Sequence, residues 1–285
     1  MKTNDLGIYV LAFNEANAIE EVITKIRNYS RSPIIISDDG SADDTPLIGQ
    51  DISQKLKNVT LITGKQNLGF GGNLKRVFDH AIKFGYLNAV IIDGDLQHDP
   101  KFIPQILNEL DKAPIVNGTR FHPESEILSE APKINAFANE TCRSIMQLLE
   151  IPVSDPLSMY LALNIRKLSG ISIKNYGYSS PLEFWYEVKK RGIPFTEIPT
   201  SMVYFKRDYT RHSTPQKVHE HAKDFLGTTL YLLRSLPKEK RLRSYDKFII
   251  NAIRIWKEGL FKLEPNQISS LTKALVEVVR KHIIS

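Results

Sequence analysis

The chain has 285 residues, of which 42% are apolar and 25% are charged, and its 15 glycines and 15 prolines are ordinary for a globular protein. This composition excludes an intrinsically disordered chain, a collagen-like repeat and a low-complexity scaffold. The formal net charge of +6 is unevenly distributed, because residues 1–200 hold 21 basic and 24 acidic side chains whereas residues 201–285 hold 17 basic and 8 acidic ones.

The N-terminal part of the chain alternates between short apolar runs and helical patterns. Strands are expected at Leu6–Phe13, Ile34–Ile36, Val59–Ile62, Asn88–Ile92 and Ile115–Val116. Helices are expected between them, over residues 15–29, 45–57, 72–84 and 100–111. Apolar residues recur at helical spacing in the first of these helices, and a proline opens the last, as is typical of a helix start. Such alternation predicts a parallel sheet with helices on both faces.

Beyond Arg120 the alternation becomes less regular. The elements expected there are a helix over 132–149, a strand at Tyr160–Leu163, a helix over 181–191 and interrupted strand material at Ile193–Tyr204. From Pro215 onward the pattern is helical. We therefore expect a body of strands and helices followed by a helical C-terminal part.

Polar and acidic residues follow three of the predicted strands. They are Asn14-Glu15, Asp38-Asp39-Gly40-Ser41 and Asp93-Gly94-Asp95-Leu96-Gln97. In open parallel sheets ligands bind beyond the carboxyl ends of the strands, so these segments should meet at one edge. A single acidic turn is usually a helix cap or a solvated loop, but three together repel one another unless a cation or a donor-rich ligand lies among them.

The segment after the fourth strand is the clearest candidate for a metal site. Gly94 allows the backbone to turn, so Asp93 and Asp95 can present both carboxylates to one side, and Gln97 adds a neutral oxygen. Oxygen ligands of this kind suit Mg²⁺ or Mn²⁺ that also carries phosphate oxygens and water.

Residues 67–73 form a glycine-rich segment that superficially suggests a dinucleotide-binding loop. The G-x-G-x-x-G pattern fails, because Leu74 stands where the third glycine is needed and the segment follows the third strand rather than the first. We interpret it as a flexible loop that approaches a ligand, with a plain helix-entry turn as the alternative.

These segments together resemble glycosyltransferase family 2, with closest similarity to the dolichyl- or polyprenyl-phosphate mannosyltransferase branch. The matching segments are VLAFNEANAIEEVI (10–23), IIISDDGSADDT (34–45), NLGFGGNLKRVFDHA (67–81), IIDGDLQHDP (91–100) and NGTR (117–120). Weaker similarity continues through DPLS (155–158) and residues 180–202. The resemblance implies a GT-A fold, which is a Rossmann-like, mostly parallel sheet flanked by helices, and here carries a C-terminal helical extension.

The resemblance also implies roles for individual residues. The nucleoside pocket would contain the backbone around Ala12 and Phe13, together with Glu15, and Asp39 would bind the base. Asp93 would contact the ribose or the metal, and Asp95 and Gln97 would hold Mg²⁺ or Mn²⁺ on the diphosphate of a nucleotide-diphosphate sugar. Arg120 would lie near the phosphates and stabilise the charge that develops as the glycosidic bond breaks. The family inverts the anomeric configuration by direct displacement.

The acceptor is less clearly indicated. A hydroxyl acceptor needs a general base, for which Asp155 and Glu183 are the candidates, whereas a phosphate monoester is already anionic and needs none. The polyprenyl-phosphate branch usually has an arginine and a serine four residues apart in the helix after N-G-T-R, where this chain has Lys133-Ile134-Asn135-Ala136-Phe137. Its S-G-F/Y motif is Ser158-Met159-Tyr160 here. Further along, Lys206 and Arg207 resemble a basic loop that closes over the donor diphosphate, with ordinary solvated side chains as the alternative.

We expect a catalytic domain over residues 1–210 and a basic helical extension over residues 211–285. Basic amphipathic helices can lie on anionic lipid, so the extension either contacts a membrane surface or packs as a cap on the catalytic body.

Neither a signal peptide nor a membrane span is expected, and the one cysteine, Cys142, cannot form an internal disulfide. The expected location is cytoplasmic, with the cytoplasmic face of the membrane as the alternative. Nucleic acid is not an expected partner, because the acidic edge would repel phosphate.

The sequence therefore predicts a metal-dependent inverting glycosyltransferase that uses a nucleotide-diphosphate sugar and a glycan or lipid-linked acceptor, in cell-surface glycan or glycolipid synthesis. Transfer to polyprenyl phosphate is the alternative within this class. A non-catalytic subunit that binds nucleotide-sugar is the alternative from another class, and a nucleotidylyltransferase is a more distant one.

Overall fold

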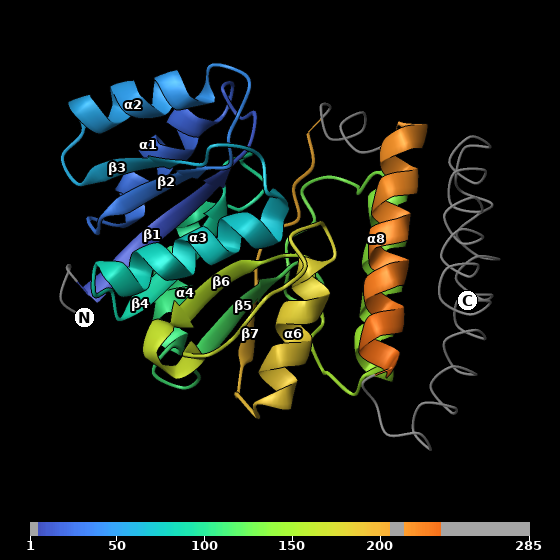
Figure 1. Cartoon of the computed structure of the whole chain (residues 1–285). Helices are drawn as coiled ribbons and strands as arrows, with labels where there is room; N and C mark the ends of the chain where they lie inside the picture. Colours follow the sequence, from blue (N-terminus) through green and yellow to red (C-terminus); the bar gives the residue numbers. More distant parts are fainter. Residues whose placement is uncertain (1–4, 206–213, 235–285) are drawn as a thin grey trace.

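The computed structural model describes residues 5–205 and 214–234, which form a sheet with helices around it (Figure 1). The strands are β1 (Leu6–Ala12), β2 (Ile34–Asp38), β3 (Val59–Thr63), β4 (Asn88–Asp93), β5 (Ile115–Thr119), β6 (Tyr160–Asn164) and β7 (Thr196–Pro199). The α-helices are α1 (Ile19–Tyr29), α2 (Thr45–Lys55), α3 (Gly69–Lys83), α4 (Ile103–Glu109), α5 (Lys133–Leu148), α6 (Ser180–Lys190) and α8 (Pro215–Arg234). Short 3₁₀ helices are η2 (Pro100–Phe102) and η3 (Ile165–Leu168).

The seven strands have the order β3-β2-β1-β4-β6-β5-β7, and one of them departs from the predicted parallel arrangement. Strands β1 to β4 pair in parallel, as do β5 and β7, but β6 runs antiparallel to both β4 and β5. The start of β6, at Tyr160, pairs with Gly118 near the end of β5. The chain thus leaves and re-enters the sheet at the same edge, so β6 must run backwards and the connection between β5 and β6 stays at the carboxyl edge.

Alternate side chains of the strands feed two separate cores on the two faces of the sheet. In β1, Ile8 and Val10 pack with the apolar sides of α1 and α4, whereas Tyr9 and Leu11 pack with α3, α5 and α6. All seven residues of β1 are buried, which is typical of a central strand covered on both faces. The predicted layering, with helices on both sides of the sheet, is therefore confirmed.

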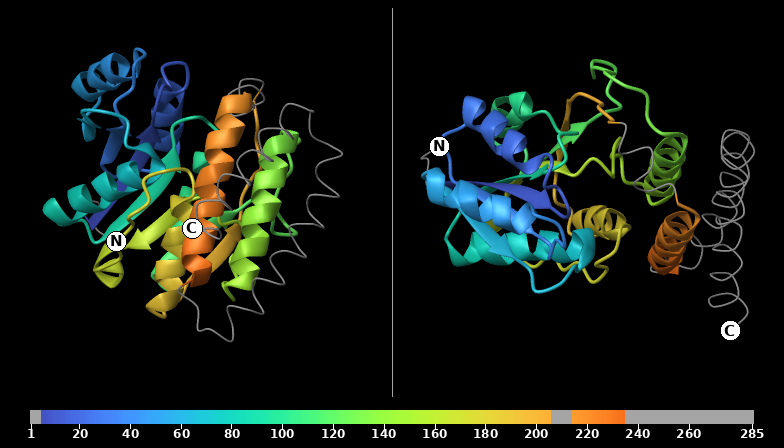
Figure 2. Two further views of the ribbon diagram at one scale, coloured as in Figure 1. Left: turned by 45° about the vertical axis from the view of Figure 1, so that its right-hand side comes forward. Right: turned by 90° about the horizontal axis from the view of Figure 1, so that it is seen from above.

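Helices α5 and α8 stand beside one another at one side of the sheet (Figure 2). The C-terminal end of α8 joins the core through Leu232 and Leu233, which are fully buried with residues of α6. Helix α8 is the part of the predicted extension that the structure describes, and it packs on the body. Within residues 5–205 and 214–234, no helix combines the length and the apolar character that crossing a membrane requires.

The glycine-rich segment is the start of helix α3 rather than a flexible loop, so the helix begins at Gly69 and not at residue 72. A Cβ atom at Gly71 would overlap the carbonyl oxygen of Asn175 and lie 2.8 Å from the Cβ of Ser180. Gly69 has a φ of +79°, and its own Cβ would overlap the carbonyl oxygen of Tyr176. These glycines are needed because the chain before α6 packs directly on the first turn of α3.

Substitution of Gly71 by alanine tests this close approach. We expect Gly71→Ala to lower the free energy of unfolding by about 1–3 kcal/mol, the usual cost of inserting a methyl group into a packed interior. Gly227→Ala is the matched control, because Gly227 also lies in a helix but none of the described atoms is within 4 Å of the position of its Cβ. It should be neutral or raise the free energy by up to about 1 kcal/mol. Urea denaturation of both variants makes the comparison, and equal effects would contradict the packing interpretation.

Candidate active site

The ends of β1, β2 and β4 bring the three acidic segments together at the carboxyl edge of the sheet. In the parallel register Leu11 pairs with Asp93, and Ala12 pairs with Asp38. The backbone N–H of Asp39 donates to the carbonyl of Ala12, at 2.9 Å, so the turns after β1 and β2 are joined directly. The convergence expected from the sequence is therefore present in the fold.

The turn after β4 holds its carboxylates through backbone geometry. The N–H of Gly94 donates to the carbonyl of Leu11 at 2.8 Å, and a Cβ at Gly94 would lie only 3.0 Å from that oxygen, so the turn packs tightly on β1. The N–H of Gln97 donates to Oδ1 of Asp95 at 2.9 Å. Asp93, Asp95 and Gln97 all line one cavity. Two carboxylates and an amide oxygen on one wall are a donor set that fits Mg²⁺ or Mn²⁺, with coordination positions left for phosphate and water. Among the described residues no cluster of three or more His, Cys, Asp and Glu side chains is present, so such a site depends on the amide and the ligand.

His98 supports this turn from beneath. Its Nδ1 accepts a hydrogen bond from the backbone N–H of Asp93 at 3.1 Å, and its ring stacks on Tyr160 with centroids 4.9 Å apart. Burial lowers the pKa of His98 to about 3, and the nearby positive charge of Arg120 acts in the same direction. The imidazole is therefore neutral at physiological pH, which leaves Nδ1 able to accept the hydrogen bond that fixes Asp93.

Asp39 is buried at the start of α3. Its Oδ2 accepts hydrogen bonds from the N–H groups of Leu68 and Gly69, at 3.1 and 2.8 Å, and its Oδ1 pairs with Arg76 at 3.1 Å. A carboxylate at a helix N-terminus satisfies donors that have no partner within the helix. The structure therefore gives Asp39 a structural contact, and its binding of a base stays a prediction.

The remaining residues assigned to the nucleoside lie at the same edge. Ala12 and Glu15 are buried, whereas Phe13 is half-buried. The backbone N–H of Glu15 donates to Oγ1 of Thr45 at 2.8 Å, which fixes the turn after β1 against the start of α2. Their contacts with a nucleoside also stay predictions. Lys206 and Arg207 fall outside the described residues.

Arg120 and Asp155 form a buried, bidentate ion pair. Nε and Nη2 of Arg120 donate to the two oxygens of Asp155, each at 2.8 Å, and the backbone N–H of Arg120 adds a third bond at 3.0 Å. Nη1 donates to the hydroxyl of Tyr204 at 3.1 Å. Although burial alone would lower it, the pKa of Arg120 is raised because the Asp155 carboxylate stabilises the cation. Asp155 uses both oxygens on Arg120, so its position does not favour the predicted role of general base.

Glu183 is also occupied elsewhere. Its Oε2 accepts hydrogen bonds from the backbone N–H groups of Lys174 and Asn175, at 3.0 and 2.7 Å, and the side chain is buried. It holds the chain segment that packs on α3, and it is not among the residues that line the cavity. Its predicted role as a base gains no support from this position.

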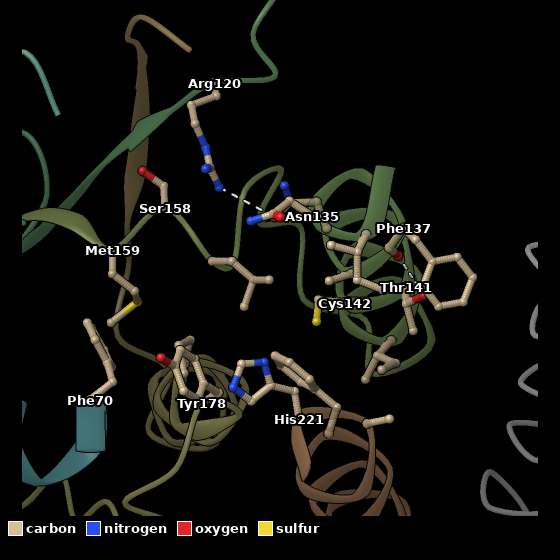
Figure 3. A pocket seen from close by; sticks show the side chains of 18 of the residues that line it. Phe70, Arg120, Asn135, Phe137, Thr141, Cys142, Ser158, Met159, Tyr178 and His221 are labelled. Atoms are coloured by element: carbon tan, nitrogen blue, oxygen red, sulfur yellow. Dashed lines mark hydrogen bonds between the residues drawn. The ribbon is translucent and has the colours of Figure 1, made fainter. Parts of the chain in front are cut away.

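The cavity itself extends from the carboxylate edge to the space between α5 and α8, with a volume of about 290 Å³ (Figure 3). Its polar end is formed by Asp93, Asp95, Gln97, His98 and Arg120. The rest is largely apolar. Helices α5 and α8 contribute to it the apolar side chains of Ile134, Phe137, Ala138, Cys142, Ile145, Val218, Ala222, Phe225 and Leu226, together with the polar ones of Asn135, Asn139, Thr141, His221 and Thr229. Tyr178 packs on His221 of α8 with ring centroids 3.9 Å apart. Sequence reasoning missed this wall; the amphipathic pattern of residues 216–235 was the available signal, but it did not say what the apolar face covers.

Comparisons with known proteins identify the family to which the chain belongs. The model of the family described as glycosyl transferase family 2 matches residues 8–168. The chain is 27% identical over 226 residues to the UDP-N-acetylglucosamine–dolichyl-phosphate N-acetylglucosaminyltransferase of Methanococcus voltae, covering 73% of this chain and 90% of that protein. It is 26% identical over 188 residues to the dolichol-phosphate mannosyltransferase of Saccharomyces cerevisiae, covering 63% of this chain and 69% of that protein.

Solved structures agree in fold. Glucosyl-3-phosphoglycerate synthase from Mycobacterium tuberculosis, in complex with phosphoglyceric acid, superposes with a TM-score of 0.61 at 16% identity, covering 82% of this chain and 81% of that one. The fold is the GT-A fold expected from the sequence. This chain belongs to glycosyltransferase family 2, and it is a transferase.

The neutral state of His98 predicts a pH dependence of stability. Below its ordinary pKa of 6.5 the unfolded chain binds a proton at this residue, whereas the folded protein does not until the pH nears 3. The free energy of unfolding should therefore fall as the pH falls through this window, by at most about 1.4 kcal/mol per pH unit. His98→Gln keeps a side-chain acceptor but cannot titrate, so its slope should be shallower in denaturation series between about pH 4 and pH 7. Identical slopes would contradict a buried neutral histidine.

The ion pair predicts a non-additive response to mutation. Asp155→Asn leaves the Arg120 guanidinium buried without a countercharge, so we expect a loss of about 3–5 kcal/mol in the free energy of unfolding. The double variant Arg120→Met/Asp155→Leu removes both charges and should be less destabilised than Asp155→Asn alone. Urea denaturation of the three proteins measures this, and a double variant that loses the most would contradict a coupled pair.

Proposed function

We propose that the chain transfers a sugar from a nucleotide-diphosphate sugar to the phosphate of a lipid-linked acceptor, with inversion at the anomeric carbon. The observation that carries this proposal is one cavity with two chemistries. A carboxylate edge lies at one end, and an apolar space between α5 and α8 forms the rest. A lipid phosphate has the matching arrangement, because an anionic head is joined to an apolar chain.

The carboxylate edge is assigned to the donor. Asp93, Asp95 and Gln97 would hold Mg²⁺ or Mn²⁺, and the nucleoside would lie toward Ala12, Phe13, Glu15 and Asp39 at the ends of β1 and β2. When bound, the divalent ion stabilises the negative charge that develops on the departing nucleoside diphosphate. The structures of glucosyl-3-phosphoglycerate synthase include one with Mn²⁺ and UDP-glucose, which supports a donor of this class on the same fold. His98 keeps Asp93 in place through its backbone.

The proposed reaction requires little acid–base chemistry from the protein. An oxygen of the acceptor phosphate forms a bond to the anomeric carbon, while the bond from that carbon to the nucleotide diphosphate breaks and its electrons leave with the diphosphate. A phosphate oxygen is already anionic, so no base is needed. Among the described residues that line the cavity, the carboxylates are Asp93 and Asp95, which the proposal assigns to the metal. Asp155 and Glu183, the predicted bases, are engaged with Arg120 and with the backbone of 174–175. This favours a phosphate acceptor over a hydroxyl acceptor.

Two polar groups near the cavity are suited to an anionic head. The hydroxyl of Ser158 is buried without a hydrogen-bond partner in the described part of the chain, and Ser158 lines the cavity. Arg120 lines the cavity beside it, held in position by Asp155. The ion pair of Arg120 with Asp155 is electrically neutral overall, so the N–H groups of Arg120 would orient a phosphate more than attract it. The relatives named for dolichyl phosphate and dolichol phosphate support this acceptor class.

The proposal keeps residues 1–210 as the catalytic unit and residues 211–285 as a basic extension. Helix α8 belongs to that extension and contributes side chains to the cavity wall. The extension would therefore take part in acceptor binding, and its 15 basic against 7 acidic residues would suit the surface of an anionic membrane from which a lipid acceptor is taken.

Replacement of one carboxylate tests the function. Asp95→Asn should reduce sugar transfer to polyprenyl phosphate at least about 100-fold, because a preorganised charge at the leaving group is lost. The assay incubates the full chain with Mn²⁺, labelled UDP-, GDP- or dTDP-sugars and polyprenyl phosphate, and measures label in the lipid fraction. Asp79→Asn is the control, since Asp79 forms an exposed ion pair with Lys75 on α3, away from the edge.

The same incubations distinguish the acceptors. Label in the lipid fraction with polyprenyl phosphate, but none with the corresponding alcohol, supports a phosphate acceptor. Transfer to the alcohol alone would overturn that part of the proposal while leaving the donor site intact. Absence of transfer from every donor, together with no thermal shift by any of them, would overturn the proposal as a whole.

A further inference from the structure

Met159 has a backbone conformation that side chains rarely adopt. Its φ is +51°, and the residue is 1% exposed, between the Asp155–Ser158 segment and the start of β6. In this region the Cβ atom lies too close to the following carbonyl oxygen, so glycine takes the conformation at lower cost. The strain needs a reason, because it lies at the wall of the cavity and not in a solvent-exposed turn.

Three of the four other described non-glycine residues with positive φ have local explanations that Met159 lacks. The fourth, Leu96, has a φ of +72° in the turn after β4 and no such explanation, but it does not line the cavity. Asn14 and Asn58 tolerate this conformation through their short polar side chains. Glu150, with a φ of +56°, follows the last turn of α5, where this conformation commonly ends a helix. Met159 has neither a short polar side chain nor a position at the end of a helix. The reason for its conformation therefore lies in the contacts of its side chain.

The sheet register places Met159 beside the carboxylate edge. Strands β4 and β6 are antiparallel, with Ile91 opposite Leu161. Continuing this register by two residues brings Met159 opposite Asp93, the first carboxylate of the D-x-D turn. Met159 lines the cavity, and in Figure 3 its side chain runs from the start of β6 toward the ring of Phe70. The thioether therefore lies where the polar end of the cavity passes into the apolar part.

We propose that Met159 is a specificity-determining residue that sets the width of the cavity at this junction. It thereby selects acceptors that are slender next to the phosphate. The inference rests on the proposed function, because it assumes that a lipid phosphate enters the cavity with its head toward Asp93. A glycine at this position would give the same backbone without strain and leave the junction wider. The strained backbone is thus the condition for presenting a long, flexible apolar side chain where the polar end of the cavity meets its apolar part.

The test compares two ligands that differ only at the carbon next to the phosphate-bearing carbon. Decyl phosphate is linear there, and 2-ethyldecyl phosphate carries a branch. Calorimetric titration of the full chain measures the dissociation constant of each with the wild type and with Met159→Gly and Glu150→Gly. In the wild type we expect the linear ligand to bind at least about tenfold more tightly, the discrimination typical of small steric differences in an apolar pocket. Met159→Gly should bring the two constants within about threefold of each other.

Glu150→Gly is the matched control, because it relieves a positive φ of similar size at a residue that does not line the cavity. It should keep the wild-type ratio. Met159→Ala keeps the strained backbone but shortens the side chain, so it should widen the junction like Met159→Gly and melt at a lower temperature than Met159→Gly. A higher melting temperature for the glycine variant than for the alanine variant is the reverse of the usual effect of glycine in regular structure. Because both variants shorten the side chain, either one can still test the role of Met159 if the other folds poorly.

The outcomes separate this inference from the proposal on which it rests. An unchanged ratio of constants in Met159→Gly and Met159→Ala would overturn the role of Met159, with lipid phosphate binding left intact. If neither ligand bound to any of the proteins, the lipid phosphate acceptor would be overturned and the inference with it. Loss of discrimination in Glu150→Gly as well would show that strain, and not the side chain at the junction, controls the width.

Discussion

The buried ion pair between Arg120 and Asp155 is the interaction on which the cavity wall beside β5 and β6 depends. It joins the end of β5 to the segment that leads into β6, and through Tyr204 it reaches the chain that follows β7. Both charges lie away from water, so the pair is stable only because three hydrogen bonds and the countercharge compensate desolvation. The same contact that stabilises the charge of Arg120 at the cavity wall also occupies both carboxylate oxygens of Asp155. Structure and chemistry are therefore linked in one pair of residues.

The carboxylate edge of the sheet could be predicted from the sequence to a large extent. Parallel strands end at one edge, so the positions of Asp38 and Asp93 follow once the apolar runs are recognised as strands. The helices on both faces follow from the same pattern. The reversal of β6 could not be predicted this way, because its apolar sequence does not depend on strand direction. The predicted beginning of α3 was wrong for a related reason. Glycine content indicates only backbone freedom, whereas the packing of residues 175–176 on Gly69 and Gly71 is a contact between distant parts of the chain.

The surroundings of Asp155 and Glu183 and the apolar part of the cavity were predicted less well, and the reason is again long-range contacts. Asp155 and Glu183 have the residue type of a base, but their partners decide what they do. Those partners are Arg120, 35 residues away, and the backbone of Lys174 and Asn175. The apolar wall between α5 and α8 combines segments separated by about seventy residues in the chain, and periodicity within each helix cannot reveal which two faces meet.

The reversed strand β6 also has a consequence for the order in which the molecule folds. The pairings of the first strands join nearby segments, such as Ile8 with Ile34 and Ile34 with Val59, whereas β6 must return to pair Asn164 with Asn88. Closing long loops costs more entropy and slows the formation of such contacts. A chain emerging from synthesis can thus complete β1, β2 and β3 early, while the cavity wall that includes α8 forms only after residues beyond 160 have arrived. Until then the unpaired edge of β4 and the apolar face of α5 are exposed, which makes this intermediate the stage most exposed to aggregation.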